Sequence, residues 1–354
     1  MKKVLAGILA VFMALSFISC GSKSETTDVS TETVKTTETA KTEEFREMKI
    51  KVGHSEAAIS IREDAVQLMN KKLQELTGGK MQIESFPASQ LGGLTQMVEQ
   101  VETDSLDAVI LGPSILQSYD PNKDCGAIQL PYLVDSYEQA WELADSDVIA
   151  KTVEDLPKNN LHFVCAWEAG FRNLTNSKKP IMSADDLKGL KVRVVESPLT
   201  IAIWNAFGAS PTPMAFSEVY TALQSHVLDG QENPTSVNYA SNFQEVQKYM
   251  TLTKHQYEPV YFVLSENTWK NMSAAEQQAF QTACETARDF VRKEIVDSEG
   301  KWLSEMEEAG MEITREFDIA SFRSHATEVY TEMKDFYGAE IVDAIVEKAE
   351  QIRN

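Results

Sequence analysis

Four side chains between residues 170 and 234 have the chemistry to bind a small organic anion. Arg172 and Arg193 supply fixed cations, Asn233 supplies an amide and Phe216 supplies an aromatic face. A guanidinium is a planar fork that pairs with both oxygens of a carboxylate, so one arginine can fix the position and orientation of an acid. No hydrolytic or redox motif accompanies these residues, and the stretch therefore predicts binding rather than catalysis.

Taken alone, these residues leave other interpretations open. Arg193 lies in the alternating run 191–195, where a period of two places it on the face opposite its valine neighbours. An arginine on a strand is often solvated, Phe216 can be a core residue, and Asn233 with the following proline can form a turn. The role of each side chain thus depends on the elements that position it.

Hydrophobic periodicity predicts those elements in the first part of the chain. Residues 48–53, 81–86 and 106–111 have the pattern of strands, and residues 62–76 and 94–103 have that of helices. The βαβαβ order predicts an α/β fold with a mainly parallel sheet and helices on both faces.

Such a sheet also predicts where a ligand lies. Binding sites in open α/β sheets lie beyond the carboxyl ends of the strands. The sequence therefore places His54, Ser55, Glu56, Gln90 and Gly112 near a cleft.

A second unit begins near Gly170, with a strand over 191–195 and a helix over 217–225. The helix, acidic turn and strand at 98–113 are similar to those at 220–234. We therefore expect two lobes of related topology, without a tandem repeat of fixed period.

The region after residue 273 has the pattern of a long helix. Ser273 and Glu276 have capping-box spacing, and Gly310 is a stop signal. An unbroken helix would be about 50 Å long and would bridge both lobes. The alternative is a pair of shorter helices with a kink near Gly300.

Charge and the amino terminus limit the function classes. The 354 residues carry 33 Lys and Arg against 54 Asp and Glu, a net charge of -21, which argues against a nucleic-acid partner. Residues 1–20 have a charged start and an apolar segment too short to span a bilayer comfortably, which predicts a signal peptide and export. Residues 21–46, mostly polar, predict a disordered tether.

Cys20 ends the signal in a sequence that resembles a lipobox, which predicts a lipid anchor on this cysteine; a non-lipidated signal peptide is the alternative. The other cysteines are Cys125, Cys165 and Cys284, an odd number without a CxxC motif. The sequence leaves open whether two of these three form a disulfide, and buried free thiols are the alternative. The 5 scattered histidines lack metal-ligand spacing, so no metal and no other cofactor is expected.

The chain after the tether resembles the DctP family, the solute-binding proteins of tripartite ATP-independent periplasmic (TRAP) transporters. The similar blocks are GGK at 78–80, FPASQLG at 86–92, LPY at 130–132, GLKVRV at 189–194 and DGQENP at 229–234. The resemblance implies a two-lobed periplasmic-binding-protein-like fold and a receptor for a small organic acid. It further implies an extracytoplasmic location, TRAP permease subunits as membrane partners and no enzymatic activity.

Lobe I is expected to comprise residues 47–169 and 259–298, and lobe II residues 170–258 and 299–354. On lobe II, the resemblance matches Arg193 with the arginine that pairs with the ligand carboxylate.

The resemblance implies three more roles on the same lobe. Arg172 matches a second ligand-side arginine, Asn233 the amide that binds the same carboxylate, and Phe216 an aromatic residue against the ligand. We expect closure to bring these residues toward His54, Glu56 and Gln90 on the other lobe.

Two glutamates depart from the sialic-acid-binding members of the family. Glu196 stands where those members carry Asn, and Glu168 similarly replaces an amide. Carboxylates facing the cleft would accept hydrogen bonds from hydroxyls and repel a second ligand carboxylate. This favours a uronate or aldonate over a C4-dicarboxylate, which is the alternative ligand. In a different interpretation, the two glutamates pair with Arg172 and Arg193 in the empty state or point away.

Two alternatives belong to other classes. One is a surface lipoprotein enzyme that acts on sugar acids, with Glu168 and Glu196 as a catalytic carboxylate pair. The other is a surface lipoprotein that binds another protein.

Overall fold

The computed structural model describes residues 45–353, which lie within one compact unit, Glu43–Asn354. The signal peptide, Cys20 and nearly all of the expected tether lie outside the described residues. The strands are β1 (Met48–His54), β2 (Met81–Phe86), β3 (Ala108–Leu111), β4 (Leu161–Asn176), β5 (Lys191–Val194), β6 (Ser210–Pro213), β7 (Gly230–Pro234), β8 (Tyr249–Ser265) and β9 (Glu312–Thr314).

Helices connect and cover these strands. The α-helices are α1 (Ile61–Thr77), α2 (Leu94–Glu102), α3 (Pro113–Leu116), α4 (Tyr137–Ala144), α5 (Asp147–Thr152), α6 (Pro198–Ala206), α7 (Phe216–Gln224), α8 (Thr235–Ala240), α9 (Glu266–Asn271), α10 (Ala274–Glu308), α11 (Ile319–Arg323), α12 (Ala326–Tyr337) and α13 (Ala339–Arg353). Short 3-10 helices are η1 (Asp124–Gln129), η2 (Leu156–Asn159), η3 (Ala184–Leu187) and η4 (Phe243–Glu245).

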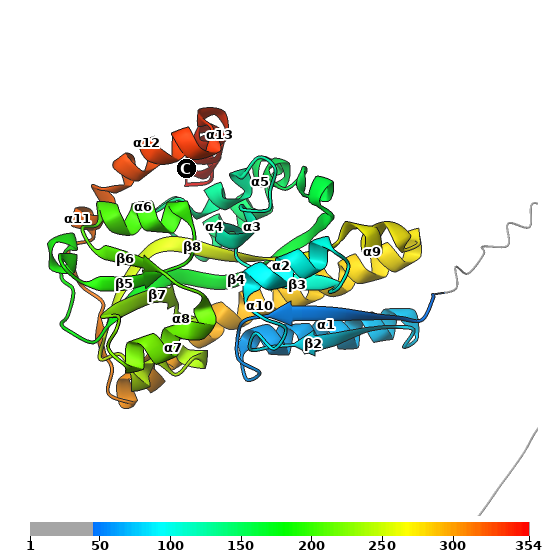
Figure 1. The fold of residues 1–354 in the computed structure, drawn as a ribbon, viewed down its shortest axis with the longest axis horizontal. Helices are drawn as coiled ribbons and strands as arrows, with labels where there is room; N and C mark the ends of the chain where they lie inside the picture. Colours follow the sequence, from blue (N-terminus) through cyan, green and yellow to red (C-terminus); the bar gives the residue numbers. More distant parts are fainter. Residues whose placement is uncertain (1–44, 354) are drawn as a thin grey trace, which may run out of the picture. The chain divides into compact units, whose positions relative to one another are not determined.

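One mixed sheet joins the described strands in the order β2-β1-β3-β8-β4-β7-β5-β6, with β9 paired to β8 (Figure 1). β1 pairs in parallel with β2 and β3, and β5 pairs in parallel with β6 and β7. The triplets β2-β1-β3 and β6-β5-β7 thus share one topology. The α/β fold class is confirmed. Between the triplets run the long antiparallel strands β4 and β8, which the sequence analysis did not predict.

The apolar strand β3 shows why both faces of the sheet carry helices. Ala108 and Ile110 belong to a core that includes residues of α1 and α10, whereas Val109 and Leu111 belong to a second core on the other face. A strand buried on both faces reads as a continuous apolar run, because neither set of alternating side chains meets solvent.

The helix α10 is continuous. It begins at the predicted capping box of Ser273 and Glu276, and it runs for 35 residues through Gly300. The kinked alternative is therefore wrong. α10 contacts α1 and β4, and also α8 and β9. Figure 1 shows it passing along the sheet from the region of β3 to that of α8. A single rigid element thus contacts structure around both strand triplets.

The predicted similarity of residues 98–113 and 220–234 is also present. α2 leads to β3 and α7 leads to β7, and each helix is followed by a left-handed turn residue, Asp104 or His226, both with φ of 57°. α2 and α7 therefore occupy equivalent positions, each before the last strand of its triplet.

Candidate ligand-binding site

A pocket of about 440 Å³ lies at the carboxyl ends of parallel strands from both triplets. It falls within the range of small-molecule sites. The first side of the pocket comes from the ends of β1 and β3 and from the start of α2. The second side comes from the ends of β5 and β7 and from the start of α7, while β4 and β8 contribute residues between them. A site at the strand ends was predicted, and this pocket lies at that position.

Most of the predicted cleft residues reach this pocket. His54, Ser55, Glu56 and Gly112 line it, whereas Gln90 is exposed and outside its lining. The preceding Ser89 lines the pocket instead.

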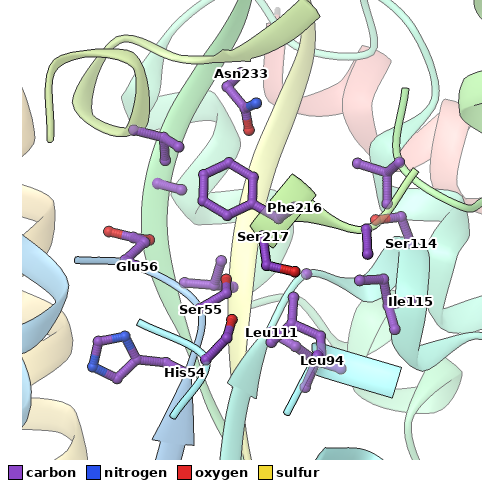
Figure 2. Close-up of a pocket in the computed structure, with 18 of the residues that line it drawn as sticks. His54, Ser55, Glu56, Leu94, Leu111, Ser114, Ile115, Phe216, Ser217 and Asn233 are labelled. Atoms are coloured by element: carbon purple, nitrogen blue, oxygen red, sulfur yellow. The ribbon is translucent and has the colours of Figure 1, made fainter. Parts of the chain in front are cut away.

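Phe216 and Asn233 both line the pocket (Figure 2). In Figure 2 they occupy the upper and middle part of the view, with His54, Leu94 and Leu111 below them. Leu94 is the first residue of α2 and Phe216 is the first residue of α7, so the amino termini of two helices border the cavity. Helix amino termini carry partial positive charge, which favours an anion in this space.

Arg193 is buried at the pocket wall without a carboxylate partner. Its side chain is 3% exposed, and its Nε and Nη2 donate to the carbonyl of Met214 at 2.9 and 2.6 Å. The guanidinium carbon lies 5.9 Å from the centre of the Phe216 ring. Among residues 45–353, no ion pair within 4.0 Å involves Arg193. Burial accordingly lowers its pKa, to about 10, so it keeps its charge at neutral pH.

Arg172 has the opposite environment. Its Nη2 donates to Glu232 Oε1 at 2.9 Å, its Nε also pairs with Glu232, and its Nη1 lies 2.9 Å from Glu258 Oε2. Burial by itself lowers the pKa of Arg172, but the charges of both glutamates raise it above its ordinary value. The positive charge of Arg172 is thus already compensated by protein carboxylates.

The two partner carboxylates respond differently to burial. Desolvation acts to raise the pKa of Glu232, but Arg172 and His255 lower it to about 2. For Glu258, desolvation exceeds the effect of Arg172 and the pKa is raised. Glu258 lines the pocket and Glu232 does not, so Glu258 is the carboxylate available to a ligand.

Asn233 belongs to the same polar network. Its Oδ1 accepts a hydrogen bond from Arg172 at 3.3 Å, and its Nδ2 donates to Gln231 Oε1. The sequence analysis therefore named three residues that the fold gathers around one wall, Arg172, Arg193 and Asn233.

The structure separates the two glutamates that the sequence analysis paired. Glu196 is exposed and lines the pocket. Glu168 is fully buried outside the lining, where it accepts hydrogen bonds from Trp141 and from Tyr257, the latter at 2.9 Å. Burial raises the pKa of Glu168 to about 7. Neither glutamate pairs with Arg172 or Arg193, so the suggested ion pairs of the empty state are wrong.

Polar groups of the first side are held by local pairs. His54 Nε2 lies 2.9 Å from Glu63 Oε2, and Glu56 accepts hydrogen bonds from Arg62 Nε and Nη2 at 3.2 and 3.1 Å. Arg62 was not recognised in the sequence because it lies on the first turn of α1, where an arginine is usually solvated.

Glu232 and Glu258 were also missed as partners of Arg172. Glu258 had a detectable signal, since a lone carboxylate in the otherwise apolar second half of β8 must find a cation when both faces of the strand are buried. Glu232 lies inside the DGQENP block, directly before Asn233, which the sequence analysis did single out.

Within residues 45–353, no group of three His, Cys, Asp or Glu side chains is arranged to hold a metal ion. No helix in the same range combines the length and apolar character that a membrane crossing requires.

A pocket formed by two related strand triplets, with a buried and unpaired cation in its wall, defines a solute-binding protein. Residues 52–335 match the family model DctP, described as bacterial extracellular solute-binding protein, family 7, and the chain belongs to this family. The family comprises extracytoplasmic receptors that bind small organic acids and work with TRAP permeases. This chain is accordingly an extracytoplasmic receptor and not an enzyme.

Individual relatives cover most of the chain. It is 32% identical over 273 residues to the 2,3-diketo-L-gulonate-binding periplasmic protein YiaO of Escherichia coli (strain K12), covering 77% of this chain and 83% of the relative. A TRAP periplasmic solute binding protein from Polaromonas sp. JS666, bound to D-erythronate, has a TM-score of 0.81 and 32% identity, covering 85% of this chain and 98% of that one. A similar protein from Roseobacter denitrificans OCh 114, with bound L-galactonate, has a TM-score of 0.78 and 32% identity, covering 88% and 100%.

Proposed function

We propose that this receptor binds a polyhydroxylated monocarboxylic acid, of the uronate or aldonate type, and delivers it to a TRAP-type permease. The observation that carries the proposal is the buried guanidinium of Arg193, which lines the pocket without a carboxylate partner. A buried charge is costly unless it is paired, and a ligand carboxylate supplies the missing partner.

The charges around the pocket support one carboxylate rather than two. Arg62 and Arg172 also line it, but each already has a glutamate partner. Carboxylates line it as well, those of Glu56, Glu196, Glu218 and Glu258. Carboxylates accept hydrogen bonds from ligand hydroxyls and repel a second ligand carboxylate. A sugar acid therefore fits better than a C4-dicarboxylate.

Two relatives support the same ligand class, because their structures hold D-erythronate and L-galactonate. In our proposal the ligand carboxylate pairs with Arg193, Asn233 donates to it after its amide leaves Gln231, and Phe216 packs against the carbon chain. The ligand hydroxyls meet Glu56 and Glu258.

We further propose that the ligand closes two lobes, 47–169 with 259–298 and 170–258 with 299–354. The ligand stabilises the closed state by its differential affinity, and the permease recognises that state. Lining residues from both strand triplets support this arrangement, since a bound acid would contact both.

Cys20 lies outside the described residues, and we propose that it carries a lipid anchor at the outer face of a membrane. Two or three acyl chains are needed for stable anchoring. A Cys20→Ala variant that stays as firmly in the membrane fraction as the wild-type protein would argue against the anchor.

Calorimetry against a matched panel tests the ligand class. The panel contains galactonate, galacturonate, succinate and the neutral sugar galactose. We expect micromolar or tighter binding of at least one sugar acid and at least 100-fold weaker binding of galactose. Equal binding of galactose, or no binding of any acid, would overturn the proposal. Tightest binding of succinate would instead support the dicarboxylate alternative.

The enzyme alternative is tested in the same samples. Mass spectrometry after prolonged incubation should recover each bound acid unchanged, because Glu168 is buried outside the pocket and cannot act on a ligand together with Glu196. A converted product would contradict a pure receptor.

A further inference from the structure

Two cysteines from distant parts of the chain meet in the core. Cys165 lies on β4 and Cys284 lies on α10, and their Sγ atoms are 2.7 Å apart. Both side chains are buried. This separation is shorter than the contact distance of two non-bonded sulfur atoms and longer than the covalent bond of about 2.05 Å. The fold therefore already places the two sulfurs so close that a small adjustment suffices for a bond.

The third described cysteine does not compete for this pairing. Cys125 lies on η1, where its Sγ lies 4.0 Å from the carbonyl of Pro113, and it belongs to a different core from Cys165 and Cys284. Among the described cysteines, the pairing of Cys165 with Cys284 is therefore the one that the geometry favours.

The extracytoplasmic location of this family supplies the chemical condition. Disulfides form and persist outside the cytoplasm, where thiols are not kept reduced. We propose that Cys165 and Cys284 form a disulfide bond that fastens α10 to β4.

The reaction is an exchange with an external disulfide. One cysteine thiolate attacks a disulfide of an extracytoplasmic thiol oxidoreductase, which gives a mixed disulfide and releases one thiolate of the oxidant. The second cysteine thiolate then displaces the other sulfur of the oxidant. The two protein thiols lose two protons and two electrons in total, and the oxidant is reduced to a dithiol.

Burial sets the order of events. It raises the pKa of the Cys284 thiol well above its ordinary value, and both sulfurs are shielded from a protein oxidant in the folded chain. Oxidation therefore takes place during folding, before α10 is fully packed on the sheet, and the finished bond is protected from reductants.

The proposed bond lies among hydrogen bonds that join the first part of α10 to β4. Near it, Gln281 donates to the carbonyl of Val164 at 3.2 Å and Trp167 donates to the carbonyl of Cys284 at 3.1 Å. Further along α10, hydrogen bonds from α8 reach Glu299 and Glu305. A disulfide fixes the first part of α10 covalently to β4 and leaves its contacts with α8 reversible.

Peptide mapping of the exported full chain tests the bond directly. The protein is denatured with an alkylating agent present and digested without reduction. We expect one cross-linked pair of peptides that contains Cys165 and Cys284, two hydrogens lighter than the separate thiols, with Cys125 alkylated. Alkylation of all three cysteines, or a bond that involves Cys125, would overturn the proposal.

Thermal unfolding provides an independent readout. The bond joins residues 119 apart in sequence, so wild-type protein that is reduced in denaturant and refolded with reductant present should have a Tm lower by about 5–10 °C. The matched Cys125→Ala variant should show the same drop, and a Cys165→Ala, Cys284→Ala double variant should show none. An equal effect of reductant on all three proteins would contradict the assignment. If the double variant fails to fold, the peptide map of the wild-type chain still decides.

Discussion

Arg172 and Arg193 are the same residue type, both buried in the wall of one pocket, yet their surroundings differ. Arg172 is paired with Glu232 and Glu258, whereas among the described residues Arg193 donates to the carbonyl of Met214 and lies near the ring of Phe216. The first arginine is part of the folded structure, and in our proposal the second keeps its charge for a ligand. Under the proposed function, pairing with protein carboxylates, and not burial or residue type, distinguishes the structural arginine from the binding arginine.

Replacing Arg172 should give the largest effect on stability. An Arg172→Ala variant leaves Glu232 and Glu258 without their cation, and we expect the free energy of unfolding to fall by about 3–5 kcal/mol. Chemical denaturation measures this change. Adding Glu232→Gln should restore part of the loss, because one unpaired charge is removed. A single variant within 1 kcal/mol of wild type, on the order of surface changes, would show that the ion pairs do not hold this wall.

Glu168 extends the comparison to a buried carboxylate without an arginine in contact. Its pKa is raised from 4.5 to about 7 by burial. The fold therefore favours the neutral form. As the pH rises from about 4.5 to about 7, the carboxyl ionises in the unfolded chain while the folded chain keeps the proton, so stability falls progressively. The full cost is on the order of 3 kcal/mol.

A Glu168→Gln variant cannot ionise at this position. The difference in Tm, variant minus wild type, should therefore become more positive by several degrees between pH 5 and pH 8, whatever its value at pH 5. The exposed Glu308 gives a matched control for the substitution itself, as Glu308→Gln. A difference for Glu168→Gln that stays constant from pH 5 to pH 8 would mean that this carboxylate is ionised throughout.

Exchanging Arg193 for lysine should weaken binding while leaving the fold intact. Lysine keeps the charge but loses the planar fork, so we expect affinity for a sugar acid to fall about 10- to 100-fold. The Tm without ligand should change little, because no protein carboxylate loses a partner. The surface variant Arg315→Lys is the control. Unchanged affinity in Arg193→Lys would show that the ligand carboxylate makes no bidentate contact with Arg193.

Phe216 should give the smallest effect of this set. A Phe216→Leu variant keeps apolar volume but loses the aromatic face near the Arg193 guanidinium. We expect a loss of about 0.5–1 kcal/mol in binding free energy, a several-fold rise in Kd. Calorimetry resolves such a change, and a loss as large as that of Arg193→Lys would mean that the ring contributes more than packing.

Local patterns made much of the fold predictable. Residues 48–111 followed period-two and helical periodicity, and the capping box at Ser273 predicted the start of α10 at the observed position. The same alternation placed Arg193 opposite its valine neighbours, which belong to a core while Arg193 lines the pocket.

The central strands were not predictable in the same way. β4 and β8 are 16 and 17 residues long and nearly buried throughout. They contain polar residues whose partners lie across the sheet rather than nearby in sequence. The pairing of Arg172 with Glu258 depends on the register of these two strands, which places Arg172 opposite Gln256 and Gly170 opposite Glu258. Strands buried on both faces lack the apolar–polar alternation that would fix such a register.

The most direct test of the account is a crystal structure of the receptor with its tightest-binding sugar acid. We predict that the ligand carboxylate lies within hydrogen-bonding distance of the Arg193 guanidinium, with Arg172 still paired to Glu232. A bound acid whose carboxylate lies away from Arg193, with that side chain still donating only to Met214, would contradict it.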